Sequence, residues 1–123
     1  MSVTTTPISS GLASNIVKDS ALGGTADNDI RNGATTVYVV SVDNSANAAA
    51  SYVKLYNNAA PTVGTTAPDI ILMCPSSVKR EFWVGGGLGI SFGTACSMAC
   101  VTTGGTAGTT SPSSSVIVNV FSS

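Results

Sequence analysis

The sequence contains no histidine and few charged residues of either sign, and these absences exclude most catalytic arrangements. Without histidine, a Ser-His-Asp triad, a Cys-His pair and the zinc sites that use histidine cannot form. Aspartate and glutamate total only 6 and are scattered, so paired carboxylates for glycoside cleavage are not indicated. We therefore expect no enzyme activity, no bound metal and no cofactor.

The chain also lacks the charge and the apolar runs that nucleic acids and membranes require. Its formal net charge is -1, and its basic residues form no cluster longer than Lys79-Arg80. The longest apolar run, Ile70 to Cys74, is far shorter than the roughly 20 residues that span a bilayer. The first twenty residues have no secretory pattern, which predicts a protein made in the cytoplasm. We expect neither nucleic acid nor membrane as a partner.

Charged residues make up 9% of the chain, against about 25% in ordinary soluble domains. A free globular protein normally stays soluble by distributing charges over its surface. A surface this poor in charge is either covered by neutral hydroxyl and amide groups or buried against a partner. The composition therefore favours a subunit of an assembly over a free enzyme.

The three cysteines, Cys74, Cys96 and Cys100, are too few and too badly spaced for a disulfide framework. On one strand, Cys96 and Cys100 would lie about 13 Å apart, whereas a disulfide needs Cα atoms within about 7 Å. A bridge from Cys74 across a sheet stays open on these grounds. We expect three buried thiols that pack as small apolar side chains.

Short β-branched and aromatic segments separated by turn residues indicate antiparallel β-structure without a helical stripe. The segment 90–102 alternates but is long for one strand, which predicts a break near Gly93-Thr94. The predicted fold is all-β, an antiparallel β-sandwich or jelly-roll-like domain over 35–123, with an extended N-terminal arm over 1–34 that holds one short strand around Leu12 to Lys18. The strands are expected within 35–43, 51–57, 69–74, 78–84, 90–102 and 115–121.

Alternation within 51–57 places Val53 and Leu55 in the core and turns Tyr52, Lys54 and Tyr56 to the opposite face. In the same way Trp83 lies outward beside two charged residues. Large amphipathic side chains of this kind dominate the energy of protein interfaces. The predicted interface residues are therefore Tyr52, Lys54, Tyr56 and Trp83. The alternative is that they fill the second face of the sandwich.

Two loops resemble ligand-binding motifs only in part. The stretch 27–33, DNDIRNG, has oxygen ligands at alternating positions, but Arg31 stands at the fifth position and no glutamate follows at the twelfth. The run 85–89, GGGLG, precedes no helix and carries no lysine, so it does not fit a phosphate loop. We expect a solvated turn at the first and a tight turn or close backbone crossing at the second.

Several blocks together carry a resemblance to a known family. YVKLYNNAAPTVGTTAPDIILMCP is followed by a glycine-rich turn, a cysteine- and alanine-rich stretch ending in VTTGG, and a terminal VIVNVF. This order resembles small virion structural proteins of tailed bacteriophages, in which a YVKLY and APTVGT block leads to a VTTG strand and a final VIVN strand. The similarity covers about Tyr52 to Phe121 and includes no catalytic motif. The three cysteines and Trp83 depart from the pattern.

The resemblance implies a β-sandwich subunit, often trimeric, that decorates the head or belongs to the tail. The leading hypothesis is a capsid decoration (cement) protein of the virion, with the major capsid protein and further copies of itself as partners. A tail, baseplate or fibre-associated protein is an alternative, with the loop 103–115 as a contact tip. A module that binds glycans through Tyr52, Tyr56 and Trp83 is another.

Overall fold

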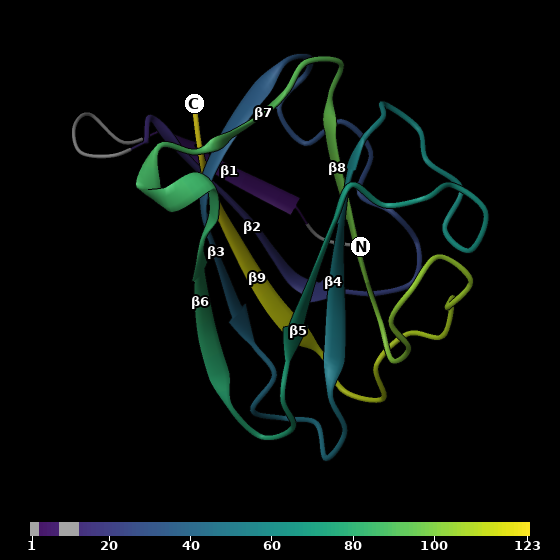
Figure 1. Ribbon diagram of the computed structural model, residues 1–123. Coiled ribbons are helices and arrows are strands. Elements are labelled where there is room, and N and C mark those ends of the chain that lie inside the picture. The colour runs from purple at the N-terminus through teal and green to yellow at the C-terminus, as the bar shows by residue number, and fades with distance from the viewer. Residues whose placement is uncertain (1–2, 8–12) are drawn as a thin grey trace.

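Nine β-strands and one 3₁₀ turn make up the computed structural model, which describes residues 3–7 and 13–123 (Figure 1). The elements are β1 (Val3–Pro7), β2 (Asn15–Leu22), β3 (Thr35–Asp43), β4 (Ser51–Asn57), β5 (Ile70–Cys74), β6 (Lys79–Trp83), η1 (Val84–Gly87), β7 (Ile90–Phe92), β8 (Cys96–Val101) and β9 (Val116–Ser122).

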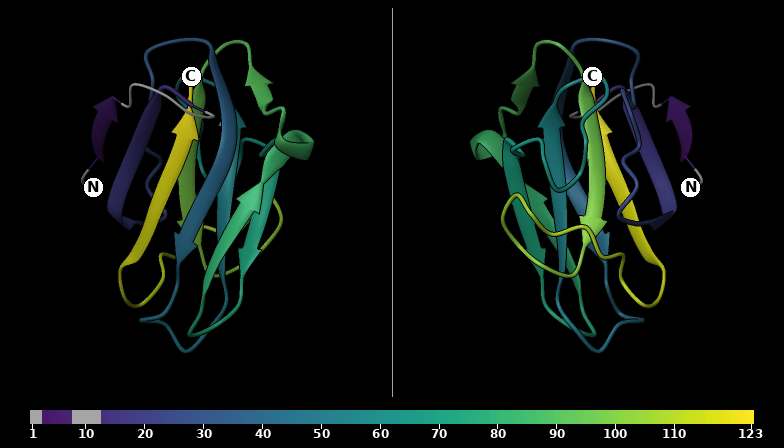
Figure 2. Two further views of the ribbon diagram at one scale, coloured as in Figure 1. Left: turned by 90° about the vertical axis from the view of Figure 1, so that its left-hand side faces the viewer. Right: turned by 90° about the vertical axis from the view of Figure 1, so that its right-hand side faces the viewer.

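The strands form two antiparallel sheets that pack face to face, which confirms the predicted β-sandwich (Figure 2). The six-stranded sheet, here called sheet A, has the order β1-β2-β9-β3-β6, with β7 also paired to β3. The three-stranded sheet, here called sheet B, has the order β5-β4-β8. The chain changes sheets between β3 and β4, between β5 and β6, between β7 and β8, and between β8 and β9. The β3–β4 and β5–β6 turns lie at the same end of the sandwich (Figure 1).

Alternating apolar side chains from both sheets fill the space between them, as period-two strands with one buried face require. Val53 and Leu55 are fully buried, as the alternation in 51–57 predicts. The predicted break in 90–102 is also confirmed, because β7 ends at Phe92 in sheet A and β8 begins at Cys96 in sheet B. The fully buried part of the core includes Val17, Val37, Val40, Val42, Val53, Leu55, Met98, Val116, Val118 and Val120.

The sequence placed residues 13–34 in an extended arm, but they belong to the sandwich. β2 pairs with β9 inside sheet A, and Val17 and Leu22 are 0% and 2% exposed. The strand was hard to recognise because a register shift between Asp19 and Leu22 interrupts its alternation. Among the described residues of the predicted arm, only β1 has every side chain exposed, and residues 1–2 and 8–12 lie outside the described part of the chain.

The run 85–89 forms a tight turn beside sheet A. Its glycines adopt positive φ angles in η1, where a side chain would be strained. Gly89 has φ +83, and a Cβ added there would lie 2.8 Å from Cδ1 of Tyr38 and 2.7 Å from Cγ2 of Thr36. The turn therefore crosses β3 at a distance that only glycine permits, which confirms the expected close crossing.

Two buried asparagines form hydrogen bonds at the end of the sandwich that holds the β3–β4 and β5–β6 turns. Asn44 and Asn47 lie in the turn after β3 and are 0% and 4% exposed. The Asn47 Nδ2 donates to the Asn44 Oδ1 at 3.0 Å, and the Ser51 Oγ donates to the same oxygen at 2.8 Å. Asn47 also accepts a hydrogen bond from the backbone N–H of Ser114 at 2.8 Å. Both side chains hold turns from distant parts of the sequence.

Candidate interaction surface

The predicted stripe of Tyr52, Lys54 and Tyr56 does lie on the outer face of sheet B, but it is not open to a partner. Lys54 and Tyr56 are 0% exposed, and Tyr52 is half-buried. Lys54 is covered by the same chain, because the loop 102–115 folds back across sheet B between β8 and β9 (Figure 2, right). The interface prediction is therefore wrong for Lys54 and Tyr56, which are structural residues.

Lys54 fixes this loop by its ammonium group. Its Nζ donates to the backbone oxygens of Thr106 at 3.3 Å and Gly108 at 2.9 Å. Burial lowers the pKa of Lys54 because the charged form loses water, and the two carbonyl groups partly replace that water. The lysine stem crosses the sheet face and its charged end holds the loop.

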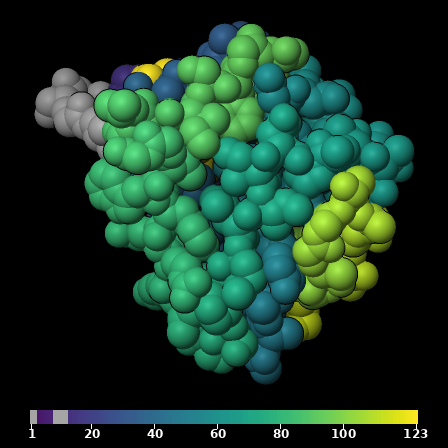
Figure 3. Space-filling view, viewed as in Figure 1, coloured from purple at the N-terminus to yellow at the C-terminus, as the bar shows by residue number. Residues whose placement is uncertain are grey.

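Close contacts show how tightly the loop lies on its surroundings. A Cβ added at Gly104 would lie 3.1 Å from the Tyr52 ring, and one at Gly64 would lie 2.5 Å from Cγ2 of Thr109. The yellow-green surface of the loop accordingly lies directly against the teal surface of the β4–β5 region in Figure 3. Tyr56 packs beneath neighbouring residues with Ala26 and Ala99.

Replacing Lys54 with methionine tests this anchoring. Methionine keeps the apolar stem but leaves two partly buried carbonyl groups without their donor, so we expect a loss of about 1–2 kcal/mol in the free energy of unfolding. The larger change is expected in hydrogen exchange of the loop amides. Lys79→Met is the matched control, because the Lys79 side chain is 75% exposed. Unchanged protection of the loop in Lys54→Met would contradict the role of the ammonium group.

Trp83 is 61% exposed at the end of β6, as predicted, and the register shows that it ends an apolar row. Trp83 lies opposite Val39, Val39 opposite Phe121, and Phe121 opposite Ile16. Directly opposed residues of antiparallel strands share a face, so these four side chains form one row across the outer face of sheet A. We call Ile16, Phe121, Val39 and Trp83 the apolar row.

The outer face of sheet A differs from that of sheet B in having no loop across it within the described residues (Figure 2, left). Ile16 and Phe121 are half-buried on this open sheet surface, and Val39 is 5% exposed between its neighbours. Next to the apolar row runs a polar one, in which Glu81, Ser41 and Asn119 oppose one another. A continuous apolar row with a polar border is the arrangement of the core and rim of a protein interface.

Trp83 was predicted from the sequence but Ile16, Val39 and Phe121 were not, because a row across a sheet depends on register and not on spacing within one strand. A second, smaller apolar area lies on β5, the edge strand of sheet B, where Ile71 and Met73 are 39% and 43% exposed. Leu88 is 86% exposed in the turn after η1.

All three cysteines are buried free thiols, as expected. Burial raises the pKa of Cys96 and Cys100 to about 12, so both stay protonated at neutral pH. The residues act as core packing and not as nucleophiles.

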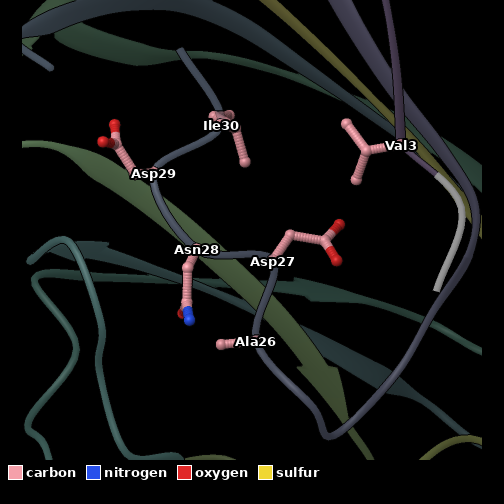
Figure 4. Close-up of a pocket in the computed structure, with 6 residues that line it drawn as sticks. All are labelled: Val3, Ala26, Asp27, Asn28, Asp29 and Ile30. Atoms are coloured by element: carbon pink, nitrogen blue, oxygen red, sulfur yellow. The ribbon is translucent and has the colours of Figure 1, made fainter. Parts of the chain in front are cut away.

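The structure contains a buried pair of carboxyl groups that was not predicted from the sequence. Asp19 and Asp27 are 0% and 2% exposed, and Asp27 lines a surface pocket of about 330 Å³ with Val3, Asn28 and Ile30 (Figure 4). The pKa of Asp27 is raised to about 8, chiefly by burial and then by the nearby carboxyl group of Asp19. Nothing in the local pattern of either residue distinguishes it from a solvated aspartate.

The stretch 27–33 forms a hydrogen-bonded turn. Asp29 and Asn32 have positive φ angles, and the Asp29 Oδ1 accepts a hydrogen bond from the Gly33 N–H at 2.7 Å. The Asp29 carboxylate points away from that of Asp27 (Figure 4). Within residues 3–7 and 13–123, no group of three or more His, Cys, Asp or Glu side chains is arranged to hold a metal ion.

The fold and surface define an all-β protein of two packed antiparallel sheets with one covered and one open outer face. No protein-family model matches the chain, and searches of curated proteins and of solved structures found no match. Among the described residues, no helix has the length and apolar character needed to cross a membrane.

Proposed function

We propose that this protein is a virion structural subunit that binds the outer surface of a bacteriophage head as a decoration (cement) protein. The observation that carries the proposal is the open face of sheet A, where the apolar row ends at the exposed Trp83. The order of blocks between Tyr52 and Phe121, which resembles virion proteins of tailed phages, supports it. So does the charge content of 9%, which suits a surface covered in the working state.

The proposed action is stabilisation of the shell by mass action. A site formed where capsid subunits meet exists only in the assembled shell, so a protein that binds it shifts the equilibrium against disassembly. The proposed partners are the major capsid protein and further copies of this chain, arranged as a homotrimer. The protein would be made in the host cytoplasm and reside in the virion.

No observation specifically favours the tail-protein hypothesis or the glycan-binding hypothesis. The loop 103–115, which a tail protein would use as a contact tip, is held against sheet B by Lys54. A glycan site built on Tyr52, Tyr56 and Trp83 would need Tyr56 at the surface, where it is 0% exposed. Tyr52 and Trp83 also lie on opposite faces of the sandwich.

Sedimentation with isolated phage heads and tails tests the proposal. We expect the purified protein to pellet with expanded heads, to saturate at a fixed number of copies per capsomer, and to raise the temperature at which the heads break. Isolated tails from the same particle are the control. Failure to bind heads together with co-sedimentation with tails would overturn the head assignment.

A further inference from the structure

The buried carboxyl pair lies between elements that belong to different sheets. Asp19 is on β2 of sheet A and points inward, because it alternates with the core residue Val17. Asp27 lies in the segment after β2 that pairs with the edge of sheet B. Its N–H donates to the Met98 carbonyl at 2.8 Å, and the Met98 N–H donates to the Asp27 carbonyl at 3.1 Å. The two buried carboxyl groups thus belong to β2 and to the segment that pairs with β8.

The carboxyl oxygens of Asp19 and Asp27 outnumber the hydrogen-bond donors around them, so the pair requires a proton. The Asp19 Oδ1 accepts from the Ala21 N–H at 2.8 Å, which orients the side chain at the register shift in β2. The other three carboxyl oxygens of the pair receive no hydrogen bond from any donor in the described part of the chain. Two ionised carboxylates with a single N–H donor between them repel each other in a buried site, whereas one shared proton lets one carboxyl group donate to the other.

We propose that Asp19 and Asp27 share one proton in the folded protein and form a pH-sensitive link between β2 and the segment that covers β8. At neutral and acidic pH the proton holds the two carboxyl groups together. As the pH rises and the proton is lost, the two negative charges repel and the 24–30 segment loosens from β2.

The neighbouring charges do not replace the proton. Lys18 alternates with Asp19 and is exposed on the outer face of β2, and Asp29 points away from Asp27. Arg31 does not contribute to the pKa of Asp27, which is raised by burial and by Asp19 and lowered by the chain's amino group. β1 and β9 carry no titratable side chain, and the thiols of Cys96 and Cys100 on β8 stay neutral up to a pKa of about 12.

The sign of the effect on stability follows from proton binding in the two states. The folded protein holds the Asp27 proton up to a pKa of about 8, whereas the unfolded chain loses it near 3.8. Between these values the folded state binds more protons, so stability falls as the pH rises and levels off above the folded pKa. The chain has no histidine, so no ordinary side chain titrates between about pH 5 and 8 and the effect stands out.

Urea unfolding of the full chain as a function of pH tests the proposal, with Asp27→Asn as the main variant. For the wild type we expect the folding equilibrium constant to fall about tenfold per unit between about pH 5 and 8. Asparagine mimics the protonated carboxyl, so Asp27→Asn should lose this slope and be more stable than the wild type at pH 9. Glu81→Gln, which removes an exposed carboxylate on β6, should keep the slope. The amino group titrates alike in all three proteins.

Hydrogen exchange distinguishes local loosening of the 24–30 segment from a general change in stability. At pH 9 the amides of Asp27 and Met98 should exchange faster in the wild type than in Asp27→Asn, while amides at the β3–β9 pairing change less. A flat wild-type profile from pH 5 to 9, or a slope that persists in Asp27→Asn, would overturn the proposal. If excess CaCl₂ restored the stability of the wild type at pH 9 but had no effect on Asp27→Asn, the proposal would also be overturned. A cation, and not a shared proton, would then neutralise the two carboxyl groups.

Discussion

Replacing Asn44 with alanine is expected to lower the free energy of unfolding by about 3–5 kcal/mol, a large effect for one small polar side chain. The Asn44 Nδ2 donates to the carbonyls of Ala49 at 3.0 Å, Pro75 at 2.9 Å and, more weakly, Cys74 at 3.3 Å. Its Oδ1 accepts from Asn47 and Ser51. Alanine would remove all of these hydrogen bonds from a site that is 0% exposed, and of the two donors to Oδ1 only Asn47 keeps another acceptor, the Ser114 carbonyl.

Two further variants identify the cause of that loss. Asn44→Asp keeps the acceptor oxygen but replaces the donor with a charge, so we expect it to destabilise the protein at least as much as alanine at neutral pH. Ser45→Ala changes the adjacent exposed residue and should cost less than about 1 kcal/mol. Urea unfolding of the three variants gives the comparison. A cost for Asn44→Ala as small as that of Ser45→Ala would show that the network does not hold the turns.

The asparagine network also shows where prediction from the sequence stops. Asn, Asp and Ser in the stretch 43–47 favour a turn, and the chain does turn there between β3 and β4. Their burial could not be foreseen, since Asn44 bonds to Pro75 and Asn47 to Ser114, which are 31 and 67 residues away. Local composition indicates that the chain turns but not what the turn touches.

Strands with a dense β-branched pattern were predictable almost to their ends. Thr35–Asp43, Ser51–Asn57 and Ile70–Cys74 form where alternation or a continuous apolar run indicated them. β2 was not recognised as a full strand, because Lys18, Asp19 and Ser20 dilute its apolar pattern and the register shift breaks its period. Asp19 in particular looks like a solvent residue, yet it points into the sandwich.

For the interaction surface, alternation gave the face of each residue but not its exposure. Tyr52, Lys54 and Tyr56 do lie on the face opposite Val53 and Leu55. Lys54 is nonetheless covered, because the loop that accepts its hydrogen bonds follows 52 and 54 residues later. Trp83 stayed exposed because β6 is an edge strand of sheet A and no described loop crosses that face.

Replacing Trp83 with alanine is expected to weaken binding to phage heads at least about 30-fold, the loss typical of a tryptophan that anchors an interface. The expectation rests on the proposed function and on the place of Trp83 at the exposed end of the apolar row. Because Trp83 is 61% exposed, its removal should change the free energy of unfolding by less than about 1 kcal/mol. Binding and folding are therefore separable in this variant.

Two control variants decide which face of the sandwich binds. Leu88→Ala removes an apolar side chain that is 86% exposed and lies outside the apolar row, so it should bind heads as the wild type does. Met73→Lys places a charge on the exposed side of the β5 edge and should also bind normally if sheet A is the contact face. Sedimentation titrations with heads measure all three affinities, and urea unfolding confirms that each variant is folded. Normal binding by Trp83→Ala with loss of binding in Met73→Lys would move the interface to the edge of sheet B, because a charge on that strand prevents both apolar contact and strand addition.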